Sequence, residues 1–304
     1  MTRLILSRLA QIAITAAILS FCAFLLIALM PGDPIDLAIA GDPRLTSEDA
    51  ARLRALHGLD QPMMARYFAW AGAVLEGRFG HSRLFAQPVA ALLGPALLSS
   101  LELLGLALVL AVGIGVSLGA LAALRPRAAP FVQALALLAQ AMPSFWLGIL
   151  LIILFAVQLG WLPAGGDGGW RFLILPVATL CFAHLAAYAR HATAALSAAM
   201  EEPHIRTARA KGAGERAVIF RHALPNAGVP LLTIAALDAG ALVSGALITE
   251  TIFARPGMGK LIYDAVMGND FNLALLALLL VAVVTMLATL AADLAQRWLD
   301  PRIA

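Results

Sequence analysis

The sequence predicts an all-α membrane protein with six transmembrane helices and an external helical subdomain between the first and second of them. Of its 304 residues, 62% are hydrophobic and 13% are charged, whereas soluble chains carry about 45–50% apolar and about 25% charged residues. The apolar residues are gathered into blocks that reach the roughly 20 residues a helix needs to cross a bilayer. The formal net charge is only +3, so no nucleic-acid partner is expected.

Six apolar blocks are the predicted spans. The first is longer than the roughly 7–15 apolar residues of a secretory signal, and no small-residue cleavage site follows it, so it is predicted to be retained. The blocks are Leu9–Met30, Leu98–Leu124, Phe131–Leu159, Leu173–Ala189, Ala227–Thr249 and Phe271–Leu294.

The basic residues between the spans predict the orientation. Only three lie in the loops after spans three and five: Arg171, Arg255 and Lys260. Twelve lie on the other side: Arg3, Arg8, Arg125, Arg127, Arg190, Arg206, Arg209, Lys211, Arg216, Arg221, Arg297 and Arg302. Because loops rich in Lys and Arg stay in the cytoplasm, both termini are predicted to be cytoplasmic.

The long segment between the first two spans is predicted to fold outside the membrane. Thr46–Leu56 has a Thr-x-x-Asp capping pattern and good helix formers, and Gly58 follows where a helix end is favoured. A second amphipathic run covers Tyr67–Leu75. This subdomain is either a scaffold or a docking surface for an external partner. The predicted regions are thus 1–30, 31–97 and 98–304, the last including a cytoplasmic loop at 200–225.

Catalytic and metal-binding patterns are absent from the sequence. Cys22 and Cys181 each lie inside an apolar block without a second cysteine or a histidine pair nearby, so both are expected to be inert thiols. No H-E-x-x-H or G-x-S-x-G motif occurs. Gly259-Lys260 is not a phosphate-binding loop, because Ala254 stands at the first glycine position and Leu261 replaces the Ser or Thr. We therefore expect neither an enzyme nor a chain that hydrolyses ATP.

The loop from Met200 to Pro225 has the pattern of a short capped helix. Acidic residues and Pro203 begin it, basic residues follow, and Gly212 ends it. A second helical stretch is predicted over Glu215–His222, before Leu224-Pro225 leads into the fifth span. The positive charges also fit a purely topological role, or contact with anionic lipid headgroups.

This loop resembles the conserved cytoplasmic loop of the binding-protein-dependent ABC importer permeases, in its dipeptide, oligopeptide and nickel branch. The resemblance rests on Arg206–Gly212, followed after nine residues by His222–Pro225, although Pro203 and His204 depart from the usual pattern. Seven further stretches resemble the same family in order: Pro31–Pro34, Gly58–Pro62, Gly80–Ser82, Pro143–Gly148, Gly160–Ala164, Glu250–Gly259 and Asp300–Arg302.

The resemblance implies a type I importer permease in a bacterial inner membrane, whose 200–225 loop forms a coupling helix on an ATP-binding subunit. Implied partners are two ATP-binding subunits, a second homologous permease, an external substrate-binding protein and the lipid bilayer. ATP and Mg would be bound by the partners, with no cofactor on this chain. The absent Cβ of Gly212 would allow close approach to the ATPase. The implied coupling residues are Glu202, Arg206, Thr207, Ala208, Arg209, Lys211, Gly212, Leu224 and Pro225.

Polar residues and prolines in or beside the spans are the candidates for a translocation pathway or gate. Asp238 lies near the middle of the fifth span, where an isolated carboxylate costs about 2.5–3.5 kcal/mol, so it either lines the pathway or pairs with another helix. His184 and Glu102 are weaker candidates. Pro143 interrupts the third span and permits a kink. The predicted pathway or gate residues are Pro143, Asp238, Glu250, Pro256 and Gly257.

Two transport mechanisms fit these features. In the importer, partner ATPases drive transport of short peptides, nickel chelates, glutathione or a related small solute that the external receptor selects. The alternative is an ion-coupled secondary transporter with Asp238 as its ionisable group, for which an internal repeat is expected and is not found among the six spans.

Overall fold

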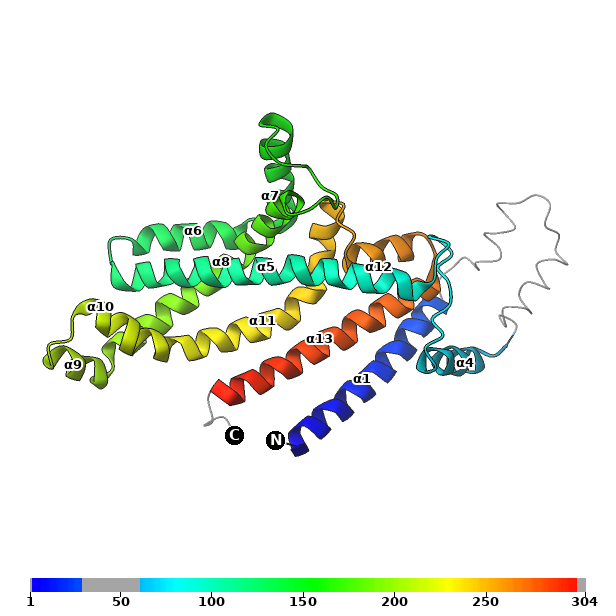
Figure 1. The fold of residues 1–304 in the computed structure, drawn as a ribbon, viewed down its shortest axis with the longest axis horizontal. Coiled ribbons are helices and arrows are strands. Elements are labelled where there is room, and N and C mark those ends of the chain that lie inside the picture. Colours follow the sequence, from blue (N-terminus) through cyan, green and yellow to red (C-terminus); the bar gives the residue numbers. More distant parts are fainter. Residues whose placement is uncertain (1, 29–60, 300–304) are drawn as a thin grey trace. The chain divides into compact units, whose positions relative to one another are not determined.

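The computed structural model describes residues 2–28 and 61–299, and these residues form helices without a regular strand (Figure 1). The predicted helix over Thr46–Leu56 lies outside the described residues. The elements are α1 (Thr2–Ala28), α4 (Met63–Leu75), α5 (Val89–Leu124), α6 (Ala129–Ala141), α7 (Ser144–Leu151), the π-helical segment η1 (Ile152–Gln158), α8 (Arg171–Glu201), α9 (Pro203–Ala210), α10 (Glu215–Ala217), the π-helical segment η2 (Val218–Ala223), α11 (Leu224–Ile252), α12 (Met258–Met267) and α13 (Phe271–Leu299).

The apolar helices confirm the predicted class of an all-α membrane protein. Among the described residues, four helices are long and apolar enough to cross a membrane: Leu6–Leu26, Val89–Leu124, Arg171–Glu201 and Phe271–Ala295. A fifth span results if the bent pair Ala129–Ala141 and Ser144–Gln158 is counted as one. The remaining predicted span, Ala227–Thr249, lies within the 29-residue helix α11.

The third predicted span is broken rather than kinked. The axes of α6 and of the helix from Ser144 to Gln158 differ by 99°. Met142 is extended, with φ −86° and ψ 120°, because the ring of Pro143 excludes the α conformation from the residue before it. Pro143 itself is exposed and precedes the first residue of α7. Apolar length alone therefore joined two helices that the backbone separates.

The fourth helix continues well past the predicted span end at Ala189. Helix α8 has 31 residues and ends at Glu201, just before Pro203. Hydropathy falls at Arg190, but the following residues are still good helix formers, so the hydrogen-bonded ladder does not stop there. Hydropathy marks the expected edge of the apolar layer, whereas the helix itself continues to Glu201, shortly before Pro203.

The chain divides into two compact units, one formed by 1–95 and 261–283 and the other by 96–260 and 284–304. In the second unit, α8 is the central helix and packs against α11, α6 and α7. Helix α5 approaches it closely at Gly115 and Gly119, where a Cβ would lie 2.6 Å from the Cβ of Tyr188 and 2.5 Å from the backbone oxygen of Ala189. An apolar cluster joins α5, α8 and α11: Leu103, Leu104, Ala107, Leu173, Val177, Leu180 and Ala246.

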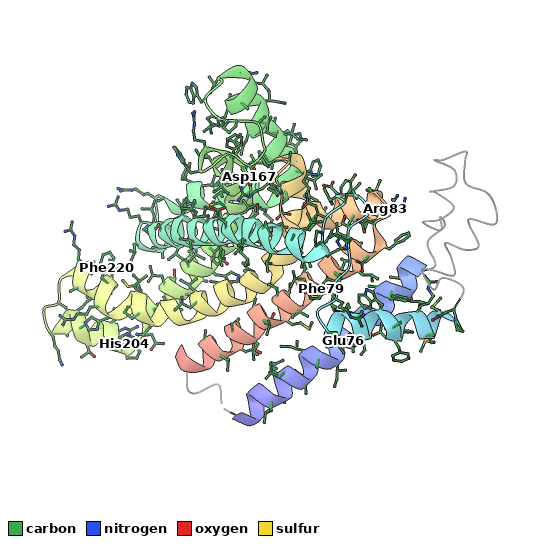
Figure 2. The ribbon with its side chains drawn as sticks, turned by 45° about the vertical axis from the view of Figure 1, so that its right-hand side comes forward. Glu76, Phe79, Arg83, Asp167, His204 and Phe220 are labelled. Atoms are coloured by element: carbon green, nitrogen blue, oxygen red, sulfur yellow. The ribbon has the colours of Figure 1, made fainter. Side chains whose placement is uncertain are left out.

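In the first unit, α4 confirms the helix predicted over Tyr67–Leu75. The ring of Tyr67 packs edge-on against Phe21 and Phe24 of α1, and its hydroxyl lies 2.9 Å from Ser20 Oγ. The same unit contains the start of α13, where the backbone N–H of Leu273 donates a hydrogen bond to the side chain of Asp270. Figure 2 shows the exposed side chains of this unit, including Glu76 and Arg83.

Candidate functional site

Helix α9 begins as its sequence predicts. Glu202 is the residue before the helix, and its carbonyl accepts a hydrogen bond from the Ile205 N–H at 3.0 Å. Pro203 occupies the first helical position, where its missing N–H costs nothing. The Glu202 side chain does not cap the helix; its Oε2 lies 3.9 Å from His204 Nδ1.

Helix α9 ends in a Schellman motif centred on Gly212. The Ala213 N–H donates to the Ala208 carbonyl at 3.1 Å, and the Gly212 N–H donates to the Arg209 carbonyl at 3.0 Å. Gly212 has φ +83°, the left-handed conformation that this motif requires. A Cβ on Gly212 would meet no atom within 4 Å. The glycine is therefore required by backbone conformation, not by crowding within this chain.

The two faces of α9 have opposite environments. Ile205 is 0% and Ala208 8% exposed, and both join an apolar cluster with the last turns of α8 and the first turn of α11. The predicted coupling residues Arg206, Thr207 and Arg209 are exposed, as are Lys211 and Gly212 beyond the helix. Ala208, also predicted to couple, is buried in this cluster and packs α9 against its own chain.

From Glu215 the chain is helical through α10 and η2 into α11 without a break. Arg209 Nη2 and Glu215 Oε1 form an exposed ion pair at 2.8 Å, which joins α9 to α10. The predicted helix over Glu215–His222 is present, with a π-helical turn at η2. Phe220 projects from η2 with 69% of its side chain exposed (Figure 2). Of the two predicted residues at the start of α11, Leu224 is half-buried and Pro225 is exposed.

At the opposite ends of α8 and α11, Glu250 holds a turn in place. Its side chain is fully buried; Ser100 Oγ donates to Oε1 at 2.5 Å, and the Lys260 N–H donates to Oε2 at 3.1 Å. Ser100 Oγ also accepts from the Met258 N–H at 2.7 Å. Gly257 lies directly on the Glu250 carboxyl group. This predicted gate residue is therefore a buried tie between α5, α11 and the start of α12.

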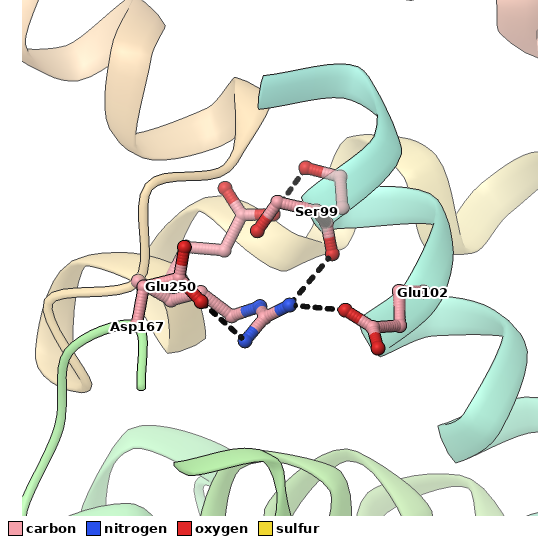
Figure 3. A network of polar contacts seen from close by, with 6 residues as sticks. Ser99, Glu102, Asp167 and Glu250 are labelled. Atoms are coloured by element: carbon pink, nitrogen blue, oxygen red, sulfur yellow. Dashed lines mark hydrogen bonds and ion pairs between the residues drawn. The ribbon is translucent and has the colours of Figure 1, made fainter. Parts of the chain in front are cut away.

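Beside Glu250, Arg255 joins three segments of the chain (Figure 3). Its Nη2 donates to Glu102 Oε2 of α5 at 2.7 Å and approaches the Ser99 carbonyl at 3.5 Å. Its Nη1 lies 4.0 Å from Asp167 Oδ1, in the loop between η1 and α8. Arg255 is 3% exposed, whereas the carboxylates of Glu102 and Asp167 are more than half exposed. We call these three residues the Arg255 cluster; Pro256 lies exposed next to it.

Asp238 is paired with another helix, one of its two predicted environments. Its Oδ2 accepts a hydrogen bond from the Tyr188 hydroxyl at 2.8 Å and lies 3.8 Å from His184 Nδ1, both on α8. Tyr188 is fully buried, while Asp238 and His184 keep 28% and 31% of their side chains exposed. The carboxylate is thus both held by a helix neighbour and partly accessible, so pairing does not exclude contact with a solute.

The structure brings the predicted residues together in two places and leaves Asp238 and Pro143 apart from both. The coupling residues lie on α9 and on either side of it along the chain. Glu250 and Gly257 meet in the buried tie, with Pro256 beside them. Asp238 lies between α8 and α11, and Pro143 separates α6 from α7. Sequence reasoning missed Arg255, Ser100, Tyr188 and Phe220. Arg255 lies in the family-like stretch Glu250–Gly259 and Phe220 lies in the 200–225 loop, whereas Ser100 and Tyr188 are marked only as polar or aromatic residues within predicted spans. Among the described residues, no three His, Cys, Asp or Glu side chains lie close enough together to hold a metal ion.

Comparison with known protein families decides the assignment. Residues 115–304 match the model described as binding-protein-dependent transport system inner membrane component, and residues 1–95 match the model of the N-terminal part of such membrane components. The chain belongs to the binding-protein-dependent ABC importer permeases. It is thus a multi-pass membrane subunit of this transporter class, as predicted.

Curated relatives of this permease cover its whole length. A probable peptide ABC transporter permease of Sinorhizobium fredii is 37% identical over 98% of both chains. A putative peptide transport system permease of Brucella abortus is 36% identical, covering 100% of this chain and 99% of the relative. The glutathione transport system permease GsiC of Salmonella paratyphi A is 34% identical, with the same coverage.

Solved importers share the permease fold. An inward-facing structure of the MetNI methionine ABC transporter matches with a TM-score of 0.60 at 22% identity, covering 70% of this chain and 98% of that chain. An amino acid ABC transporter matches with a TM-score of 0.55 at 16% identity, covering 68% of this chain and 94% of that chain. These matches confirm the predicted type I importer architecture.

Proposed function

We propose that this permease forms, with a second homologous permease, the translocation pathway for short peptides or a related small solute such as glutathione or a nickel chelate. Support for the solute class comes from relatives named as peptide and glutathione permeases over nearly the full length. An external substrate-binding protein would deliver the solute. The family to which the chain belongs, together with the absence of an internal repeat, disfavours the ion-coupled secondary transporter.

The division of α9 into a buried and an exposed face carries the proposed coupling mechanism. Ile205 and Ala208 fasten the helix to the ends of α8 and α11, while Arg206, Thr207 and Arg209 project outward. A partner that moves the exposed face must therefore move these two long helices with it, as a rigid body. Two ATP-binding subunits, which would hold ATP and Mg, are the proposed source of this movement. Hydrolysis would then occur on those subunits and not on this chain.

The pathway is proposed to involve Asp238 and the opposite end of the helices. The exposed parts of Asp238 and His184 offer a polar contact to a cationic or amino-terminal group. The turn with Pro256 and Gly257, closed by Glu250, is proposed to contribute to the external gate. With both termini in the cytoplasm, as the basic residues predict, α9 would face the ATP-binding subunits and this turn would face the external receptor.

A single bulky substitution on the exposed face of α9 tests the coupling role. Ala210 and Ala164 are both exposed, the first at the end of α9 and the second in the loop before α8. Ala210→Trp should prevent the ATP-binding subunits from co-purifying and abolish ATP-dependent uptake, because the added ring separates the two surfaces. Ala164→Trp, the same substitution at the opposite end, should retain the ATPases. The measurement is subunit composition after mild-detergent purification, with uptake into vesicles.

Normal uptake and normal ATPase recovery in the Ala210→Trp protein would exclude α9 as the coupling helix. Recovery of the wild-type chain alone, with solute movement in ATP-free vesicles, would favour the ion-coupled transporter and direct attention to Asp238.

A further inference from the structure

Arg255 is a buried cation with incomplete pairing. Only one contact is a short hydrogen bond, from Nη2 to Glu102 at 2.7 Å. The Ser99 carbonyl and the Asp167 carboxylate lie at 3.5 and 4.0 Å, and Nε has no hydrogen-bond partner although it is buried. A guanidinium has more N–H donors than these contacts use. Because a buried, incompletely paired charge is costly, this arrangement is a poor permanent fastening.

The neighbouring tie through Glu250 makes Arg255 unnecessary as a fastening. Glu250 is fully buried, and each of its oxygens accepts a hydrogen bond, from Ser100 and from the Lys260 N–H. This tie already joins the turn to α5, the helix that also carries Glu102. The turn therefore has one buried connection, in which both carboxylate oxygens are hydrogen-bonded, and one connection through Arg255 whose carboxylate partners reach water.

The backbone holds Arg255 between its two acceptors. Phe253, 1% exposed, accepts a hydrogen bond at its carbonyl from the Gly166 N–H at 2.7 Å, which joins the turn to the loop that contains Asp167. Ala254 has φ +48°, a left-handed conformation that is costly for a residue with a Cβ. Such strain persists only where the surroundings enforce it. Arg255 is thereby directed between Glu102 on one side and Asp167 on the other (Figure 3).

We propose that the Arg255 cluster is a releasable latch of the external gate, in which the guanidinium exchanges Glu102 for Asp167 as the pathway opens. Arg255 is thus a positioning residue for transport. The inference rests on the proposed importer function. Exchange between two carboxylates never leaves the cation without a counter-charge, so a second arrangement is available to the same turn. Bonding to Glu102 ties the guanidinium to α5, and bonding to Asp167 transfers this second tie to the loop before α8, while Glu250 and Ser100 keep the turn on α5 in both arrangements.

The latch predicts opposite effects for the two carboxylates. Glu102→Gln weakens the closed arrangement, so the assembled transporter should hydrolyse ATP without the external receptor at least about fivefold faster than wild type. Asp167→Asn weakens the open arrangement, so receptor-stimulated hydrolysis should fall by a similar factor while the receptor-independent rate does not rise. If the two carboxylates were needed only for stability, one substitution would not raise the receptor-independent rate while the other lowered the receptor-stimulated rate.

The experiment uses the purified complex of both permeases and the ATP-binding subunits in lipid vesicles, assayed with and without the receptor. Glu76→Gln is the matched control: Glu76 is 64% exposed and paired with Arg78, outside the cluster, and both rates should equal those of wild type. Arg255→Glu alone should lose receptor stimulation. Adding Glu102→Arg should restore the closed pair, because the exchanged charges attract again, but should not restore receptor stimulation, because the carboxylate introduced at position 255 and Asp167 would repel each other.

Three outcomes would overturn the latch. Wild-type rates in both Glu102→Gln and Asp167→Asn would show that Arg255 exchanges with neither carboxylate. Equal losses of assembled complex and of both rates in the two variants would show an ordinary structural contact. If the wild-type complex lacked ATP-binding subunits, or showed no ATP-dependent uptake, both the importer proposal and the latch would be overturned. The first two outcomes would leave the importer proposal intact.

Discussion

Gly212 shows how one residue determines where the α9 loop turns. Its φ of +83° allows the N–H groups of Gly212 and Ala213 to reach back to carbonyls of the helix, which closes the last turn. Among the residues that the structure describes, no other atom lies within 4 Å of a Cβ built at this position. A substitution therefore acts on the backbone first and on a bound partner second, so the two effects need separate variants.

Gly212→Val is expected to loosen the end of α9 by about 1–2 kcal/mol, because a β-branched residue resists the left-handed conformation. Gly212→Asn should retain the cap, since asparagine tolerates this conformation. The measurement is hydrogen exchange of the Ala213 amide together with recovery of the ATP-binding subunits. Gly214→Ser is the control, because Gly214 has an ordinary φ of −63° and open space around it. Equal amide protection in the valine and asparagine variants would contradict the conformational explanation.

At the scale of elements, the contact between α5 and α8 depends on small residues. A Cβ on Gly119 would lie 2.5 Å from both the Ala189 oxygen and the Ala192 Cβ. The helices therefore approach at backbone distance, as membrane helices with small residues at their interfaces do. Helix α8 carries this contact on one side and the α11 and α9 contacts elsewhere, so a displaced α5 would also disturb the helix that ends at α9.

Gly119→Ala is expected to destabilise the folded permease by about 1–3 kcal/mol, the usual cost of overpacking. Gly105→Ala, on the same helix, should be neutral or slightly stabilising, because no atom lies within 4 Å of its added Cβ and alanine favours a helix. Thermal unfolding in detergent compares the two alanine variants directly. The close-packing explanation would be wrong if both melted at the wild-type temperature.

At the scale of the whole molecule, the two candidate regions lie at opposite ends of the α8–α11 pair. The loop before α8 and the turn after α11 share one end, and the α9–α10 segment between the helices forms the other. With helices of 31 and 29 residues, each rising about 1.5 Å per residue, the ends are separated by more than the roughly 30 Å of a bilayer's apolar core. The basic residues predict that the α9 end is cytoplasmic.

Single cysteines at Ala217 and Ala164 test this orientation, because both alanines are exposed and lie at the two opposite ends. The background should lack the native Cys22 and Cys181. In intact cells with a permeable outer membrane, a membrane-impermeant maleimide should label Ala164→Cys, and label Ala217→Cys only after the inner membrane is opened. The reverse pattern would invert the topology and exclude α9 as a contact for cytoplasmic ATPases.

The sequence alone located most features that depend on neighbouring residues, and it failed at two helix boundaries. Apolar runs located the spans, and Glu202-Pro203 with Gly212 located the ends of the α9 region, because bilayer thickness and helix capping act over a few turns. The boundary errors have local causes too: the extended Met142 before Pro143 broke the third span, and the long α8 continued past Arg190. Hydropathy reports the environment of a residue and does not report the path of its backbone.

Only the tertiary structure decided which polar residues meet. Glu250 bonds to Ser100 across 150 positions, Arg255 bonds to Glu102 across 153, and Tyr188 reaches Asp238 across 50. No periodicity or capping rule connects residues so far apart, since their contact depends on how several helices pack together. The burial of Glu250 and of the incompletely paired Arg255 is likewise a product of that packing, because it depends on the neighbours that exclude water from each side chain.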